Sequence, residues 1–233
     1  SIVTEPPHSF RAALQLMWIV ALVDCAYVTP NPTLTLGRMD SILYPYYKSD
    51  VESGRLTRDE AKEYITDYYC KHNLIMGRGE HQVGGDNATG FSRICNFDAP
   101  QYLLLAGSDE NGKSAANELT ELFAECIVPE FKNPVIVFYY TKNLNAERPE
   151  LWKTLADKAL KSSSMMFYND DSVRKAYQKI GLKPEETKDF YHFGCNWGAP
   201  CMDANWMLGG PKAVKYDTAP RTPEVDEINR LPY

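Results

Sequence analysis

The stretch Val135-Ile136-Val137-Phe138 decides the fold class, because four consecutive apolar residues fit a strand that is buried on both faces. A helix with Pro149 in its first turn follows and reaches about Lys161. The next short apolar run is Met165-Met166-Phe167. Since a helix separates the two buried strands, we expect them to pair in parallel. The sequence therefore predicts an α/β fold.

The same alternation extends from this unit in both directions. Upstream, Tyr102-Leu103-Leu104-Leu105 is a predicted strand, and residues 115–127 form a predicted helix. Downstream, a predicted helix over residues 171–180 ends at Gly181, and residues 191–194 form the next predicted strand. We expect these strands to pair in parallel as well.

Two further helices are predicted nearer the beginning of the chain. Ser9 can cap a helix over residues 10–27. Thr57 and Glu60 form a capping-box signature for a helix over residues 58–74. With the strands and helices that follow, they predict a single α/β region that takes in residues 1–233.

Two segments do not fit the alternation. Residues 77–100 hold five glycines and show little hydrophobic period, which indicates a long loop. A loop of this length is functional, covered by a partner, or disordered. Residues 211–233 form a polar tail that contains proline and no core-forming element.

Composition argues against two kinds of partner. The net charge is −6, from 25 basic and 31 acidic residues, and the chain has no run of lysine and arginine, so we expect no nucleic-acid binding. The apolar stretch over residues 12–26 is too short to cross a membrane and fits a buried amphipathic helix. We therefore expect no membrane partner.

The cysteines are widely and irregularly spaced, with no C-x-x-C pair. They are Cys25, Cys70, Cys95, Cys126, Cys195 and Cys201. In a chain of this size we interpret them as free thiols in a reducing, cytoplasmic environment. The histidines show no metal-ligand spacing, so no metal site is predicted.

Cys195 follows a short apolar strand at a Gly-Cys tip, in Asp189-Phe190-Tyr191-His192-Phe193-Gly194-Cys195-Asn196-Trp197. An apolar, aromatic environment disfavours a thiolate, so this thiol suits hydrogen-atom chemistry. A small packed core residue is the simpler interpretation. An ionic pair with His192 is the third, although residues three apart on a strand point to opposite faces.

Several motifs, in order, resemble the central part of the glycyl radical enzymes, the pyruvate formate-lyase-like family. They are Pro7-His8-Ser9-Phe10-Arg11-Ala12-Ala13-Leu14-Gln15, Gly37-Arg38-Met39-Asp40 with Tyr44-Pro45-Tyr46-Tyr47, Gly54-Arg55-Leu56-Thr57, Ala106-Gly107-Ser108-Asp109-Glu110-Asn111-Gly112 with Asn117-Glu118-Leu119-Thr120, Phe167-Tyr168-Asn169-Asp170-Asp171, and Gly194-Cys195. The resemblance covers the chain from about Pro7 to Gly210.

The resemblance implies a fold and a chemistry. The fold is part of a ten-stranded α/β barrel with the thiyl cysteine, here Cys195, at its centre. An anaerobic enzyme of this kind binds no cofactor directly; an S-adenosylmethionine iron–sulfur activating enzyme installs its glycyl radical. Asn196 and Trp197 are expected to bind a small organic substrate through their proximity to Cys195, and Thr120 and Asn117 through their motif.

This chain departs from the family pattern in two ways. The glycyl loop, R-V-x-G-Y, does not occur in this sequence. We therefore expect a partner chain or further polypeptide to complete the barrel, and we expect the protein to be an oligomer. Trp197 stands where several branches have a glutamate, and Asn196 stands where pyruvate formate-lyase has a second cysteine. Lyase or C–C bond chemistry is the first hypothesis. The alternative is a non-catalytic or degenerate subunit that binds a small molecule or supports a partner chain.

Two further expectations concern individual side chains. Cys201 could be a second reactive thiol or a metal partner of His192 and Cys195, although their spacing matches no common zinc site; a passive packed thiol is the simpler interpretation. Arg38 and Asp40 could form a structural ion pair.

Overall fold

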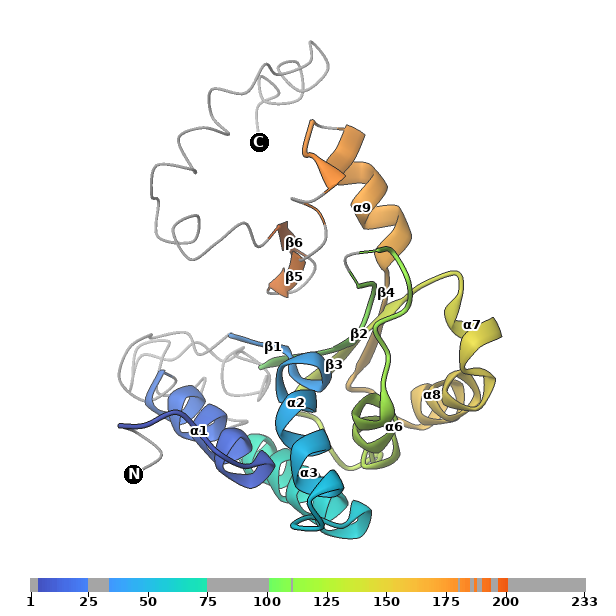
Figure 1. Ribbon diagram of the computed structural model, residues 1–233. Helices are drawn as coiled ribbons and strands as arrows, with labels where there is room; N and C mark the ends of the chain where they lie inside the picture. Colours follow the sequence, from blue (N-terminus) through green and yellow to red (C-terminus); the bar gives the residue numbers. More distant parts are fainter. Residues whose placement is uncertain are drawn as a thin grey trace, which may run out of the picture.

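The computed structural model describes residues 4–24, 34–74, 101–109, 111–179, 181–184, 187, 190–193 and 197–200 (Figure 1). The predicted loop over residues 77–100 and the predicted tail over residues 211–233 lie outside these ranges. The elements in chain order are α1 (Phe10–Val23), β1 (Thr35–Arg38), α2 (Met39–Glu52), α3 (Arg58–Asn73), β2 (Tyr102–Ala106), α6 (Glu118–Glu125), β3 (Val135–Tyr140), α7 (Leu144–Glu147), α8 (Pro149–Lys161), β4 (Met165–Asn169), α9 (Asp170–Lys179), β5 (Phe190–Phe193) and β6 (Trp197–Pro200).

The core of the fold is a parallel sheet with the order β1-β2-β3-β4, which confirms the predicted α/β class. Its two faces bury different side chains. Leu103, Ile136 and Phe138 pack with helices α1, α2, α3, α6 and α8, which lie on one side of the sheet in Figure 1. Leu104, Val137 and Tyr139 pack with Phe190 of β5 instead. Burial on both faces explains why β2 and β3 read as continuous apolar runs.

The predicted helix ends are mostly confirmed by their caps. The Ser9 hydroxyl accepts a hydrogen bond from the Ala12 N–H at 3.2 Å and begins α1. Thr57 and Glu60 form the capping box of α3. Pro149 opens α8, and Gly181 follows α9 with φ of +101°, a conformation that favours glycine.

Three features differ from the sequence prediction. Helix α6 begins at Glu118 rather than at residue 115, because the Asn117 side chain accepts from the N–H groups of Leu119 and Thr120. Strands β1 and β6 and helices α2 and α7 were not predicted. Pro45 lies inside α2, where proline normally argues against a helix, and this concealed the element.

Strand β5 is the third difference, and the parallel pairing expected for it is wrong. It pairs antiparallel with β6, from Phe190 opposite Pro200 to Phe193 opposite Trp197, in a separate two-stranded sheet. This small sheet lies on the side of the main sheet opposite helices α1, α2, α3, α6 and α8, the side where α9 also packs (Figure 1). A short apolar run contains no information on which strand it will pair with, so the antiparallel pairing of β5 with β6 could not be predicted from the sequence.

The edge of the main sheet at β4 remains open within the described part of the chain, where β4 pairs with β3 alone. Phe167 on this strand is 41% exposed. An exposed aromatic residue on an edge strand fits a surface that another element covers. Among the described helices, none is both long and apolar enough to cross a bilayer.

A buried histidine joins α1 to α3. The ring of His72 lies 5.0 Å from that of Trp18 and 4.5 Å from that of Tyr68. Burial lowers the pKa of His72 to about 4, so the native imidazole stays neutral where an unfolded one, with its ordinary pKa of 6.5, takes up a proton. Its contribution to stability is therefore present above pH 6.5 and is lost as the pH falls toward 4.

We expect this loss to be about 3 kcal/mol between pH 6.5 and pH 4. The measurement is the free energy of unfolding in urea across this range for the wild type and for His72→Phe, which keeps an aromatic ring. The variant should lose less stability over that range than the wild type. Equal losses in both proteins would show that His72 is not the group responsible.

Candidate functional site

Three tyrosines from adjacent strands line the face of the main sheet that β5 covers. We call Tyr102, Tyr139 and Tyr168 the tyrosine face. Tyr139 and Tyr168 are register partners, with ring centroids 5.9 Å apart. Tyr102 and Tyr139 are buried. Their phenol rings form the floor on which β5 lies.

Strand β5 places two side chains on this floor. The Phe190 ring lies 4.9 Å from the ring of Tyr139. The His192 ring is fully buried and lies 5.5 Å from Tyr102 and 5.0 Å from Tyr168. Through these contacts, the strand that leads to Gly194 and Cys195 packs against an aromatic surface.

Side-chain hydroxyls tie the backbone of β5 to the main sheet. The His192 N–H donates to the Tyr139 hydroxyl oxygen at 2.7 Å, and that hydroxyl donates to the Phe190 carbonyl at 3.4 Å. The Thr35 hydroxyl donates to the His192 carbonyl. Burial raises the pKa of Tyr139 far above its ordinary value of 10.0, so its hydroxyl stays neutral and serves both as donor and as acceptor.

A cluster of four charged side chains and one serine lies beside the tyrosine face, where the parallel strands end. We call Arg38, Asp40, Ser108, Asp170 and Arg174 the strand-end cluster. The strand-end cluster and the tyrosine face meet at Gly107: a Cβ added there would lie 3.2 Å from Arg38 Nη2 and 3.2 Å from Tyr139 Cδ2. Its φ of +88° also favours glycine.

Asp40 holds the turn that follows β2. Its carboxylate accepts from the Ala106 N–H at 2.7 Å and from the Thr120 hydroxyl at 2.6 Å. Ala106 has φ of +61°, a strained conformation for a residue with a side chain. Burial raises the pKa of Asp40, while these hydrogen bonds and the nearby charge of Arg38 oppose that shift. Asp40 thus stabilises the backbone where the sheet meets the candidate site.

The rest of the strand-end cluster converges on Ser108. Its carbonyl accepts from both terminal nitrogens of Arg38 at 3.2 Å and from Arg174 at 3.2 Å. Its hydroxyl donates to Asp170, which also forms an ion pair of 3.0 Å with Arg174. These charged groups are engaged with one another and with the backbone, so they are suited to fixing strand ends rather than to exchanging protons with a substrate.

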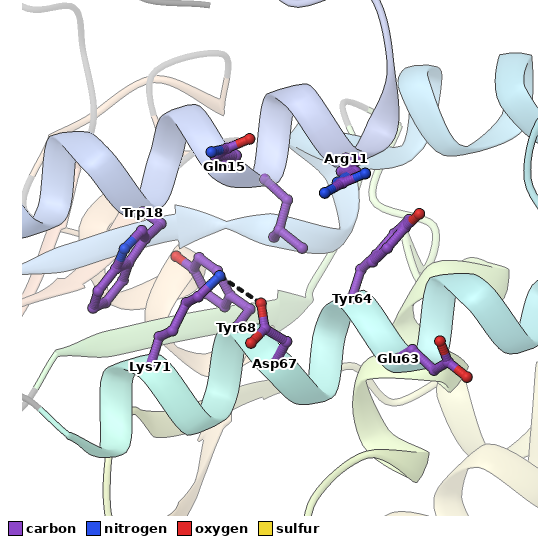
Figure 2. A pocket seen from close by; sticks show the side chains of 9 residues that line it. Arg11, Gln15, Trp18, Glu63, Tyr64, Asp67, Tyr68 and Lys71 are labelled. Carbon is purple, nitrogen blue, oxygen red and sulfur yellow. Dashed lines mark hydrogen bonds and ion pairs between the residues drawn. The ribbon is translucent and has the colours of Figure 1, made fainter.

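A separate groove of about 340 Å³ lies between α1 and α3, on the helix side of the sheet (Figure 2). Its two cations are engaged, because Lys71 pairs with Asp67 at 2.5 Å and the Arg11 guanidinium lies 5.5 Å from the centre of the Tyr64 ring. We assign this groove no role in the chemistry. Among the described residues, no group of three or more histidine, cysteine, aspartate and glutamate side chains could hold a metal.

Comparison with known proteins identifies the family. The family model described as pyruvate formate lyase-like matches residues 1–210. The chain belongs to this family. The predicted resemblance to glycyl radical enzymes is thereby confirmed.

Three relatives illustrate the range of the pyruvate formate lyase-like proteins. A 4-hydroxyphenylacetate decarboxylase glycyl radical subunit from Clostridioides difficile is 29% identical over 219 residues, which cover 90% of this chain and 23% of the relative. An isethionate sulfite-lyase from Bilophila wadsworthia is 25% identical over 193 residues, which cover 82% and 22%. The crystal structure of a glycyl radical enzyme from Archaeoglobus fulgidus matches with a TM-score of 0.64 at 26% identity, covering 84% of this chain and 24% of that one. The matched part of this chain therefore covers less than a quarter of the length of each of these relatives.

The predicted site residues of this family member fall into two groups. Cys195, Asn196 and Cys201 lie outside the described residues, and of Trp197 only the backbone, at the start of β6, is described. Residues 194–196 connect the paired ends of β5 and β6. The predicted radical cysteine thus belongs to the connection between two strands, one of which packs on the tyrosine face.

Thr120 and Asn117 are described, and both have partners within the chain. Thr120 is fully buried and donates to Asp40, and Asn117 caps α6. Their contact with a substrate stays a prediction. The expected ion pair of Arg38 with Asp40 gives way to a different arrangement, in which Asp40 binds Thr120 and Ala106 while Arg38 binds the Ser108 carbonyl.

Sequence reasoning missed the tyrosine face. Tyr102 and Tyr139 lie within apolar runs, where a tyrosine reads as one more core residue. The available signal was their position on alternate, strand-spaced residues that share a face with Leu104 and Val137. Nothing in the sequence indicated that their hydroxyls would meet a later strand.

Proposed function

We propose that this chain is the thiyl-bearing portion of a glycyl radical enzyme that acts on a small organic substrate by lyase or C–C bond chemistry. The observation that carries the proposal is the packing of β5, the strand that leads into Gly194 and Cys195, on the tyrosine face, of which Tyr102 and Tyr139 are buried. The relatives, which include a decarboxylase glycyl radical subunit and a sulfite-lyase, support the reaction class.

The chemistry of this face suits a hydrogen-atom relay. Among the described side chains of the tyrosine face and β5, the polar groups are phenols and one imidazole, and none is a carboxylate. Apolar surroundings keep a thiol protonated. The glycyl radical takes the hydrogen atom of the Cys195 S–H bond and becomes a closed-shell glycine, and the thiyl radical then takes a hydrogen atom from a substrate C–H bond. Exclusion of water protects both radicals.

The residues that follow Cys195 restrict the classes of reaction that the enzyme can catalyse. Trp197 stands two positions on and cannot act as a general acid or base, which disfavours reactions that need a carboxylate there. C–C bond formation does not need a carboxylate at that position. We propose that Asn196 and Trp197 contact the substrate. For Asn117 and Thr120, the observed contacts favour positioning of Asp40 over direct substrate binding.

The proposal requires two partners. The first is the polypeptide that carries the glycine loop, whether it continues this chain or is a separate one; the open edge at β4 and the exposed Phe167 favour such a completion. The second is an activating enzyme with an iron–sulfur cluster and S-adenosylmethionine, which supplies the glycyl radical in this family.

The test is anaerobic activation of the protein together with its glycine-bearing segment, followed by electron paramagnetic resonance and a turnover assay with candidate substrates. We expect an organic radical that appears only after activation, and turnover that requires it. Turnover without activation would overturn the proposal. A radical with no turnover on any small substrate would favour the alternative of a non-catalytic subunit, for which the tryptophan at position 197 is the supporting observation.

A further inference from the structure

We propose that Tyr139 and Thr35 are positioning residues for Cys195, acting through the backbone of His192. This inference rests on the proposed function, in which Cys195 relays a hydrogen atom. It goes further by naming the groups that set the position of the strand leading to the sulfur.

The pairing of β5 creates the need for such groups. In an antiparallel pair, opposite residues alternate between those that exchange hydrogen bonds and those whose N–H and C=O groups point away from the partner. His192 stands opposite Gly198, and its N–H and C=O groups are bound by Tyr139 and Thr35. Both groups therefore point away from β6 and toward the main sheet. The hydroxyls of Tyr139 and Thr35 thus make the hydrogen bonds that a neighbouring strand would otherwise make to His192.

Tyr139 is held rigidly enough to serve as a fixed anchor. It is 1% exposed, and its ring lies against those of Phe190 and Tyr168. The ring also faces the backbone of Gly107, where even an added Cβ would lie only 3.2 Å from its Cδ2. Its hydroxyl donates to the Phe190 carbonyl as well, so it binds β5 at two points.

The anchored residue is close to the reacting sulfur along the chain. His192 and Cys195 are three positions apart in the chain, which limits their Cα separation to about 10 Å. A shift of β5 on the tyrosine face is therefore passed to the tip that carries the thiol. Because a misplacement of about 1 Å can cost ~100-fold in rate, loss of one anchor should lower turnover by at least ~10-fold.

Two variants remove one hydroxyl each and keep the shape of the side chain. Tyr139→Phe keeps the ring contacts and leaves the buried His192 N–H without its acceptor. Thr35→Val removes the donor to the His192 carbonyl. Tyr140→Phe is the matched control, because Tyr140 is the next residue on β3 and its ring packs 5.1 Å from Trp152 on the helix side of the sheet.

The experiment uses the complete activated enzyme and three measurements: radical spins per chain, kcat and KM for the substrate, and exchange of the glycyl α-hydrogen in D2O without substrate. In D2O the thiol becomes S–D. The glycyl radical takes that deuterium atom, and the thiyl radical takes back the hydrogen, which leaves a deuterated glycyl radical. This exchange reports the approach of sulfur to glycine and does not depend on substrate binding.

We expect Tyr139→Phe and Thr35→Val to form the radical, to keep KM within about 2-fold, and to lose at least ~10-fold in both kcat and exchange rate per spin. Tyr140→Phe should match the wild type. A purely structural role would lower the spin count and leave the rates per spin unchanged, and this result would overturn the inference. If Tyr139→Phe forms no radical, then kcat and the exchange rate per spin of Thr35→Val test the inference in its place.

A parallel Cys195→Ser variant separates this inference from the proposed function. Turnover in Cys195→Ser would refute the proposed function itself. If Cys195→Ser is inactive while both anchor variants have wild-type kcat and exchange per spin, the proposed function stands and the positioning role is refuted.

Discussion

Turnover by the activated enzyme should fall by at least ~10⁴-fold in Cys195→Ser, which corresponds to ~5 kcal/mol of activation free energy. The reason is the strength of the bond to be broken: a serine O–H bond is much stronger than a thiol S–H bond, so the glycyl radical cannot take its hydrogen atom. The change is otherwise small, since serine differs from cysteine by one atom. The glycyl radical itself should persist, because it is installed on another segment.

Cys201→Ser is the matched control for this prediction. It makes the same chemical change six residues further on. If Cys201 is a passive thiol, turnover in this variant should stay within about 2-fold of the wild type. A loss as large as that of Cys195→Ser would show that both sulfurs take part. Full turnover in Cys195→Ser would contradict the assignment of the relay.

The stability of the protein should fall by about 3 kcal/mol or more in Asp40→Ala. This change leaves the buried Ala106 N–H and the buried Thr120 hydroxyl without their acceptor, at a cost of about 1–3 kcal/mol each. It also frees the turn at Ala106, whose φ of +61° needs outside support. Urea unfolding followed by circular dichroism measures the difference.

Two milder variants calibrate this effect. Thr120→Val removes one donor to Asp40 and should cost about 1 kcal/mol, and Thr120→Ser, which keeps the hydroxyl, should cost less. If Asp40→Ala costs no more than Thr120→Val, then Asp40 does not hold the strand end in the way its contacts indicate.

The sequence predicted those elements whose signals are local. Three elements could be predicted from local patterns alone, and all three are confirmed. They are β3 from its four apolar residues, α8 from the proline in its first turn, and α3 from its capping box. Helix α2 carries a proline in its interior, and its sequence therefore argued against the element that forms. The partner of β5 depends on where the chain returns after Trp197, which no pattern within β5 encodes.

The candidate site was predictable only in part, for the same reason. Cys195 could be singled out because the Gly-Cys tip and the motifs before it follow a family order. The groups that anchor its strand come from β1 and β3, which precede His192 by 157 and 53 residues. Hydrogen bonds between such distant residues leave no periodic signal in the sequence.

The central claim is that Cys195 relays a hydrogen atom inside an enclosed cavity, and the most direct test is a crystal structure of the complete enzyme with its glycine loop. We expect the Cys195 sulfur to lie at the tip between β5 and β6, shielded from solvent and facing both the glycine and a substrate cavity. A sulfur in bulk solvent, away from the glycine, would contradict it.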